Sequence, residues 1–350
     1  NDEVNSMTFY NYELINRSTQ TLTNTYFGVW VDSDIGCSED DYIGCDVQRG
    51  LGYQYNADAV DDGCQYAING FTPAIGVDFF EGPYQDNDTI DNPLTTDVNQ
   101  AFAEDGIPYK GLGIGYGDSI ADNERFGMKR FVYFDRTLQA NIYGDPQIGV
   151  DFYNYMLGKW RDNTPFVYGG TGNGADANAD PNILTNYCFP GDSDPLNWGT
   201  VSAGGGNAVP FSNWSEQSPA GTGSTPNPQG DRRFVQAAGP FVLEPGALNN
   251  ITTGVVYGKS QSNDPFSSVE EVRKADDKAQ ALFDNCFRIL NGPDSPELVV
   301  QELDKELILY LKKTETIEAY SEVDPIIISY GYTEEEAKYR FEGYQIYQVL

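Results

Sequence analysis

The chain has 350 residues with 53 acidic and 21 basic side chains, and its formal charge of -32 repels nucleic acid phosphates and anionic lipid headgroups. It contains no histidine, which excludes Ser-His-Asp and Cys-His nucleophilic sites and histidine-bearing zinc sites. No apolar run reaches the roughly 20 residues of a membrane helix. We therefore expect no nucleic acid partner and no membrane insertion. Paired carboxylates of the glycosidase type survive this test, but the sequence establishes no such pair, and we expect a non-enzymatic protein.

Residues 7–31 predict two strands at the start of the chain. Apolar and polar side chains alternate in "FYNYEL" and again in "FGVWV", and the polar turn "NRSTQT" lies between them. We expect a β-hairpin or a strand pair within one sheet.

From residue 50 to 260, short apolar or aromatic runs such as "PAIGVDFF" and "MKRFVYFD" are broken by Gly, Asn, Asp and Pro. This texture is typical of an antiparallel β-sandwich with long loops. One helix is predicted at about 267–290, where an apolar stripe follows a capping box of Ser267 and Glu270. The fold class is therefore mainly β, and the helix closes a first domain at residues 1–292.

Residues 293–350 predict strands at 297–302 and 306–311 and a third in "RFEGYQIYQVL", with a long insertion before it. Three strands leave open sheet edges and a half-exposed core, so we expect the chain to continue beyond Leu350.

The segment "WVDSDIGCSEDDYIGCD" concentrates carboxylates without any basic residue. Calcium binds six to eight oxygen ligands, and a bound ion would offset the repulsion between these side chains. The alternative is a solvated acidic loop. As ligands of Ca²⁺ we expect Asp32, Asp34, Asp41 and Asp46, while "YNADAVDDG" at 55–63 adds a further ligand or forms a polar turn.

A second candidate loop for Ca²⁺ is "GADANADP", which places Asp176, Asn178 and Asp180 at alternate positions. Pro181 stands where an EF-hand has its glycine, so this is not an EF-hand. The segment is either a loop site for an ion or an ordinary polar turn.

Five cysteines form no CxxC pair, which argues against zinc ribbons and thioredoxin-type sites. Cys37 and Cys45 bracket the acidic loop, and we expect them to form a disulfide, the alternative being two buried thiols. Cys286, at the margin of the helix stripe, is predicted to be a buried free thiol.

Several stretches together resemble large exported proteins of Bacteroidota that carry signals for type IX secretion. They include "FGVWVDSDIGCSEDDYIGCDVQRGLGYQYNADAVDD", "YNYMLGKWRDNTPFVYGG", "YCFPGDSDP" and "DRRFVQAAGPFVLEPGALNNITTGVVYGKS". Residues 293–350 look like the start of a fibronectin type III-like domain. The resemblance implies a location outside the cell or on its surface and calcium binding. "DTI" and "DSI" also resemble an O-glycosylation motif, which implies Thr89 and Ser119 as acceptors.

Together these features predict a non-enzymatic, calcium-stabilised structural or adhesive module of a longer secreted or cell-surface protein. Its partners would be other surface proteins or further domains of the same chain. One alternative is a carbohydrate-binding accessory region of a secreted hydrolase, with a glycan stacked on loop tryptophans Trp160, Trp198 or Trp214. Another is a subunit of a surface filament that a strand from another chain completes.

Overall fold

The computed structural model describes residues 3–345, except 104–105, 108, 110, 112, 137–140, 206–207, 209, 288–289, 291, 313 and 330. The chain divides into two compact units, Asn1–Asp276 and Asp277–Leu350. The division falls inside a helix, whereas the sequence places the boundary at residue 292. The predicted fold class is confirmed, because the structure is mainly β with several antiparallel sheets and few helices.

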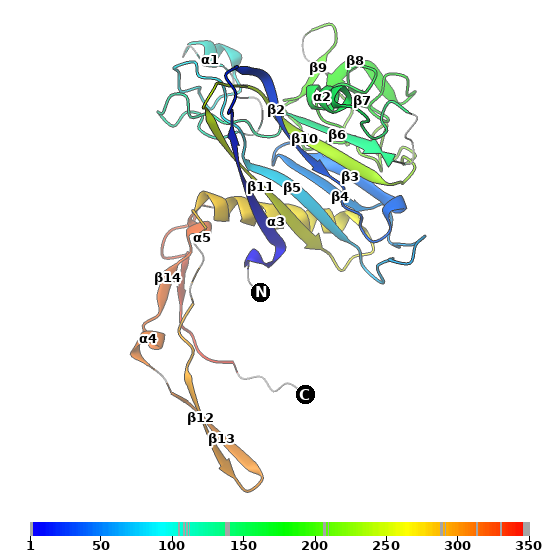
Figure 1. Ribbon diagram of the computed structural model, residues 1–350. Helices are drawn as coiled ribbons and strands as arrows, with labels where there is room; N and C mark the ends of the chain where they lie inside the picture. Colours follow the sequence, from blue (N-terminus) through cyan, green and yellow to red (C-terminus); the bar gives the residue numbers. More distant parts are fainter. Residues whose placement is uncertain are drawn as a thin grey trace. The chain divides into compact units, whose positions relative to one another are not determined.

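The first unit contains a five-stranded sheet in which all neighbours are antiparallel, as Figure 1 shows. Its strands, in spatial order, are β1 (Met7–Ile15), β11 (Leu248–Lys259), β5 (Pro73–Glu81), β4 (Leu51–Asn56) and β3 (Asp41–Asp46). A second, three-stranded sheet consists of β2 (Leu22–Val31), β10 (Arg232–Leu243) and β6 (Arg130–Asp135).

The two sheets share one core, which is rich in aromatic side chains. Gly52 of β4 lies so close to Phe131 and Phe234 of the second sheet that a Cβ at this position would approach both rings within 2.8 Å. Successive residues of a strand point to opposite faces, so Asp41, Ile43 and Cys45 of β3 face the second sheet with Gly52.

Helix α3 (Phe266–Asp284) covers the other face of the five-stranded sheet with its first turns. Val272 packs beside Gly76 of β5 and Gly258 of β11, where a Cβ would lie within 2.7 Å of it. Since Gly76 is opposite Tyr53 in the β4–β5 register, Tyr53 and its β3 neighbours Gly44 and Asp46 share this face. The two ends of β3 therefore present aspartates to different layers.

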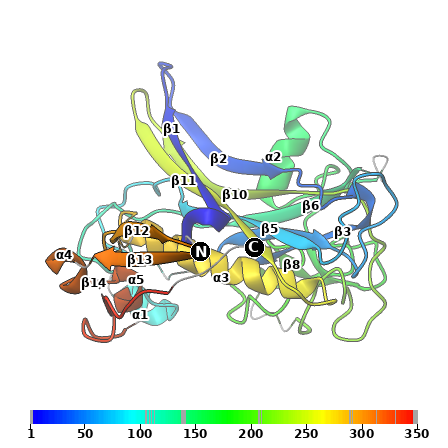
Figure 2. The ribbon, with the colours of Figure 1, turned by 90° about the horizontal axis from the view of Figure 1, so that it is seen from below.

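The prediction that residues 7–31 form a hairpin or a strand pair in one sheet is wrong. β1 pairs with β11 and β2 pairs with β10, so the two strands belong to facing sheets (Figure 2). Tyr12 and Phe27 meet between the sheets with ring centroids 5.4 Å apart. An alternating pattern predicts a strand with one apolar face. It does not distinguish a neighbour in the same sheet from a strand in the opposite sheet.

The predicted helix begins at Phe266 rather than Ser267 and ends at Asp284 rather than near 290. Its cap is not the predicted Ser267–Glu270 box. The carboxylate of Asp264, two residues before the helix, accepts a hydrogen bond from the Phe266 N–H at 3.1 Å and so satisfies one amide of the first turn.

A smaller sheet and short helices complete the first unit. The sheet contains β7 (Val167–Gly169), β8 (Ala179–Thr185) and β9 (Thr200–Ser202). The short helical elements are η1 (Glu3–Ser6), η2 (Ser38–Asp40), α1 (Val98–Ala103) and α2 (Gly149–Leu157).

In the second unit, the two predicted strands are confirmed as the antiparallel pair β12 (Glu297–Leu303) and β13 (Glu306–Lys312). The predicted insertion contains α4 (Glu315–Glu318), β14 (Ser321–Val323) and α5 (Pro325–Ser329), and β14 pairs with β15 (Lys338–Arg340). The predicted third strand has no counterpart in residues 341–345, and its remainder, 346–350, lies outside the described residues.

Candidate cation site

Three carboxylates meet where β2 ends and β10 begins. Asp32 and Asp34 follow the last residue of β2, and Asp231 immediately precedes β10. These strands are antiparallel neighbours, with Val31 opposite Phe234, so the exit of one lies beside the entry of the other. One carboxylate oxygen from each residue lies within 4.8 Å of the other two, and we call this group the aspartate triad.

The guanidinium of Arg233 offsets part of the charge of the aspartate triad. Arg233 Nε lies 2.8 Å from Asp32 Oδ1 and 3.6 Å from Asp231 Oδ1, and its Nη1 lies 3.0 Å from Asp145 Oδ2. Burial raises the pKa of Asp231, and the charges of Asp34 and Asp32 raise it further against the opposing effect of Arg233. Arg233 thus forms ion pairs with three acidic side chains.

Asp41, at the start of β3, is fully buried. Its Oδ2 accepts hydrogen bonds from the Ile35 N–H at 3.1 Å and the Gln54 side chain at 2.8 Å, whereas its Oδ1 has no hydrogen-bond partner among the described residues. Burial raises the pKa of Asp41 to about 8, outweighing the two hydrogen bonds, and the charges of Asp40 and Asp34 contribute to the rise.

The backbone places Asp41 beside the aspartate triad. Asp41 forms an isolated bridge with Gly230, the residue before Asp231, and its backbone carbonyl oxygen accepts the Gly230 N–H at 3.4 Å. On the other side Asp41 is opposite Asn56, whose buried Oδ1 also has no hydrogen-bond partner. Two buried acceptor oxygens without donors therefore lie on one face of the sheet, and oxygens of this kind are ligands for a hard cation.

The fourth predicted ligand, Asp46, lies elsewhere. It ends β3 on the face that α3 covers, and its Oδ2 is 2.9 Å from Arg49 Nη1 and 3.0 Å from Arg273 Nε. The structure therefore brings Asp32 and Asp34 together, sets Asp41 beside them, and separates Asp46 from them.

In the second predicted loop, the carboxylates bind backbone amides. Asp176 accepts N–H groups from Thr171 at 3.0 Å and Asn178 at 2.9 Å, and Asp180 accepts the Asn182 N–H at 2.9 Å. These are turn contacts, and the acidic ligand group found among the described residues is the aspartate triad.

The disulfide joins Cys37 to Cys64, with Cα atoms 5.6 Å apart, so the prediction of a Cys37–Cys45 bond is wrong. Cys45 lies inside β3 with its side chain in the core, where its Sγ is 3.5 Å from the Cys188 carbonyl oxygen. Cys45 and Cys188 are buried free thiols. Cys286 is free as predicted, but it is exposed rather than buried.

The disulfide links the acidic loop to the segment of residues 56–68, which contains Cys64. Asp61 Oδ1 accepts the Cys37 N–H at 2.9 Å and its Oδ2 accepts the Ile68 N–H. Gly36 has φ +76°, and a Cβ there would lie 1.8 Å from Asp61 Oδ2, so this position requires glycine. The segment after β4 therefore holds the acidic loop in place from outside.

Thr89 and Ser119, the predicted O-glycosylation acceptors, are both exposed. They lie on two segments of the chain that are hydrogen-bonded to each other. The Thr89 N–H donates to Asp122 at 2.8 Å, and the Ser119 N–H donates to Asp91 at 2.7 Å. Thr89 and Ser119 both have positive φ, +69° and +73°.

Comparison of the chain with protein-family models, with curated proteins and with solved structures finds no match. Among the described residues, no helix combines the length and the apolar character that crossing a membrane requires. The site must therefore be interpreted from its own geometry.

Sequence reasoning missed Asp231, because it lies far along the chain from Asp32 and Asp34. The sequence does show an acidic residue directly before the strand "RRFVQAAGPFVL". That Asp231 lies beside Asp32 and Asp34 becomes visible only from the pairing of β2 with β10.

Proposed function

We propose that this protein is a non-enzymatic, calcium-stabilised β-sandwich module with a structural or adhesive role in a secreted or cell-surface protein. The observation that carries the proposal is the buried carboxylate of Asp41, with one oxygen unpartnered, beside the aspartate triad. Isolated buried charge is costly, so such a group either keeps its proton or gains a cation.

Calcium fits the donor set better than other common ions. The triad, Asp41 and Asn56 offer oxygen atoms only, from carboxylates and one amide, and calcium accepts six to eight such ligands in flexible geometry. Zinc and copper sites favour imidazole or thiolate ligands.

A location outside the cell is supported by the Cys37–Cys64 disulfide, because such bonds persist in oxidising surroundings. The exposed Thr89 and Ser119 hydroxyls are compatible with glycosylation of an exported protein. The resemblance to type IX secretion substrates favours the same location. A structural or adhesive role follows from that resemblance and from the lack of histidine-based catalytic groups in the sequence.

The test is a thermal melt of residues 1–350 with calcium, with excess chelator, and after calcium is added back. A ligand that binds only the native state at a thousandfold excess over Kd stabilises it by about 4 kcal/mol. We expect a reversible fall of the melting temperature in chelator, with magnesium restoring less than calcium. An unchanged melting temperature would leave Asp41 protonated and remove calcium from the proposal.

A further inference from the structure

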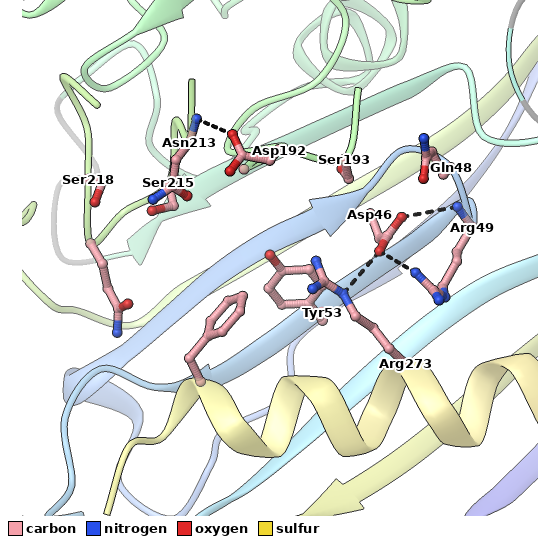
Figure 3. Close-up of a pocket in the computed structure, with 13 residues that line it drawn as sticks. Asp46, Gln48, Arg49, Tyr53, Asp192, Ser193, Asn213, Ser215, Ser218 and Arg273 are labelled. Atoms are coloured by element: carbon pink, nitrogen blue, oxygen red, sulfur yellow. Dashed lines mark hydrogen bonds and ion pairs between the residues drawn. The ribbon is translucent and has the colours of Figure 1, made fainter. Parts of the chain in front are cut away.

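A polar pocket of about 360 Å³ lies between the α3-facing end of β3 and two loops of the first unit. Figure 3 shows Arg49, from the turn between β3 and β4, and Arg273, from α3, converging on Asp46, with Asp192 and Asn213 across the pocket. Its volume is within the range of small-molecule sites.

The charged side of the pocket is rigidly built. Asp46 has only 3% of its side chain exposed and binds both guanidiniums, and its Oδ1 also accepts the Arg49 backbone N–H at 3.2 Å. Arg273 makes a further ion pair with Glu270 at 2.7 Å. Both arginines therefore form ion pairs with acidic side chains, which balance their charge.

The opposite side of the pocket carries side-chain amides that can hydrogen-bond a ligand, together with the carboxylate of Asp192. The side-chain amides of Gln48, Asn213 and Gln217 line the pocket, and among the described residues none of them makes a hydrogen bond. Each amide offers both donors and acceptors. Ser215 adds a hydroxyl, and Asp192 is held in place by the Asn213 backbone N–H.

An aromatic wall completes the pocket. Phe266, partly exposed at the start of α3, packs edge-on against the buried Tyr53 with ring centroids 6.2 Å apart. The Arg273 guanidinium carbon lies 5.6 Å from the centre of the Phe266 ring. The pocket thus combines an apolar ring with groups that donate and accept hydrogen bonds.

From this combination we infer that the pocket binds a neutral saccharide, one or two hexose units of a glycan. A pyranose presents C–H groups to an aromatic ring, and its adjacent hydroxyls both donate and accept, so they can bond to amides, which do both, and to carboxylates, which accept. The balanced charges of the pocket offer no excess positive charge for an acidic sugar, and the net charge of -32 repels a polyuronate. This site is separate from the aspartate triad and does not depend on calcium.

The test uses titration calorimetry of residues 1–350 with neutral hexasaccharides of glucose, mannose and galactose, and with oligogalacturonate for comparison. We expect at least one neutral probe to bind. The double variant Asn213→Ala/Gln217→Ala should lose at least about tenfold in affinity, which corresponds to 1.4 kcal/mol. Gln20→Ala, an exposed amide in the β1–β2 turn, is the matched control and should leave binding unchanged.

Three results would overturn the inference: no neutral probe binds at millimolar concentration, binding persists unchanged in the double variant, or oligogalacturonate binds more tightly than the neutral probes. Thermal melts of each variant establish that it is folded. Because the calcium melt and the glycan titration report on different residues, either proposal can fail while the other stands.

Discussion

The two ends of β3 show two ways of treating a buried aspartate. Asp46 ends the strand toward α3, and two arginines bind its carboxylate at 2.9 and 3.0 Å. Asp41 begins the strand toward the second sheet, equally buried, with Gln54 and the Ile35 N–H on one oxygen and nothing on the other. In the part of the chain that the structure describes, Asp46 forms ion pairs with two arginines, whereas Asp41 forms none.

The difference teaches that sequence clustering and structural clustering of charge are separate things. Both aspartates lie in the same acidic stretch, but the alternation of strand side chains sends them to opposite layers. On the α3 side, arginines from a turn and a helix neutralise the charge. On the other side, Asp34 and Asp40 add negative charge and raise the pKa of Asp41 further.

The largest expected effect concerns the proposed calcium site beside Asp41. Asp231→Asn removes one charge from the aspartate triad, so we expect most of the calcium-dependent stabilisation, about 4 kcal/mol at saturating calcium, to disappear. The measurement is the shift of the melting temperature when calcium is added to chelator-treated protein.

Asp180→Asn is the matched control, since this half-buried carboxylate accepts hydrogen bonds from Asn182 of the same strand, β8, outside the triad. Its calcium-dependent shift should equal that of the unaltered protein. If Asp180→Asn and Asp231→Asn respond to calcium alike, the triad is not the calcium site.

A smaller effect is expected at Asp46. Arg273→Gln leaves this carboxylate, with 3% of its side chain exposed, to Arg49 alone. Losing one partner of a buried ion pair should lower the free energy of unfolding by about 2 kcal/mol, less than full loss because Arg49 remains. Urea unfolding measures the change, and it should be the same with calcium and with chelator.

Two further variants sharpen this result. Adding Asp46→Asn to Arg273→Gln removes the carboxylate charge that has lost a partner. The double variant should therefore recover part of the lost free energy of unfolding. Lys274→Gln, which breaks an exposed pair on the same helix, should not change stability measurably. A calcium-dependent loss in Arg273→Gln would mean that the two ends of β3 are not independent.

Local pattern predicted much of the fold. The strands β12 and β13 and the helix α3 followed from alternation and from an apolar stripe, because both signals lie within the element itself. The pairing partners of the strands did not follow from local pattern. β1 and β2 lie in different sheets because β11 and β10 pair with them from more than two hundred residues away.

The same limit applies to the site. Asp32 and Asp34 were found because they are neighbours in sequence, whereas Asp231 joins them through the β2–β10 pairing. The disulfide was mispaired because Cys45 is close to Cys37 in sequence, but its strand position turns its side chain into the core. Proximity along the chain was a poor guide in both cases, since strand geometry decides which side chains meet.

The smallest effect concerns Asp78, a buried aspartate on the α3 side of β5. Its Oδ1 accepts the Phe79 N–H at 2.7 Å, and Leu51 separates it from Asp46 in the sheet register. Burial raises the pKa of Asp78 to about 8, and the charge of Asp46 raises it while Phe79 N–H and Arg49 oppose the rise. The two arginines on this face therefore do not neutralise every buried carboxylate.

The sign of the pH dependence follows from this raised pKa. Between the ordinary aspartate value and about 8, folded Asp78 keeps a proton that the unfolded chain has lost, so stability is full at low pH and falls as pH rises. Asp78→Asn keeps the acceptor oxygen and removes the titration, so it should flatten the fall by about 1 kcal/mol per pH unit between pH 6 and 7. Urea midpoints at several pH values, in constant calcium, measure it. Parallel curves for the variant and the unaltered protein would show that Asp78 is already ionised and that the arginines on this face also serve Asp78.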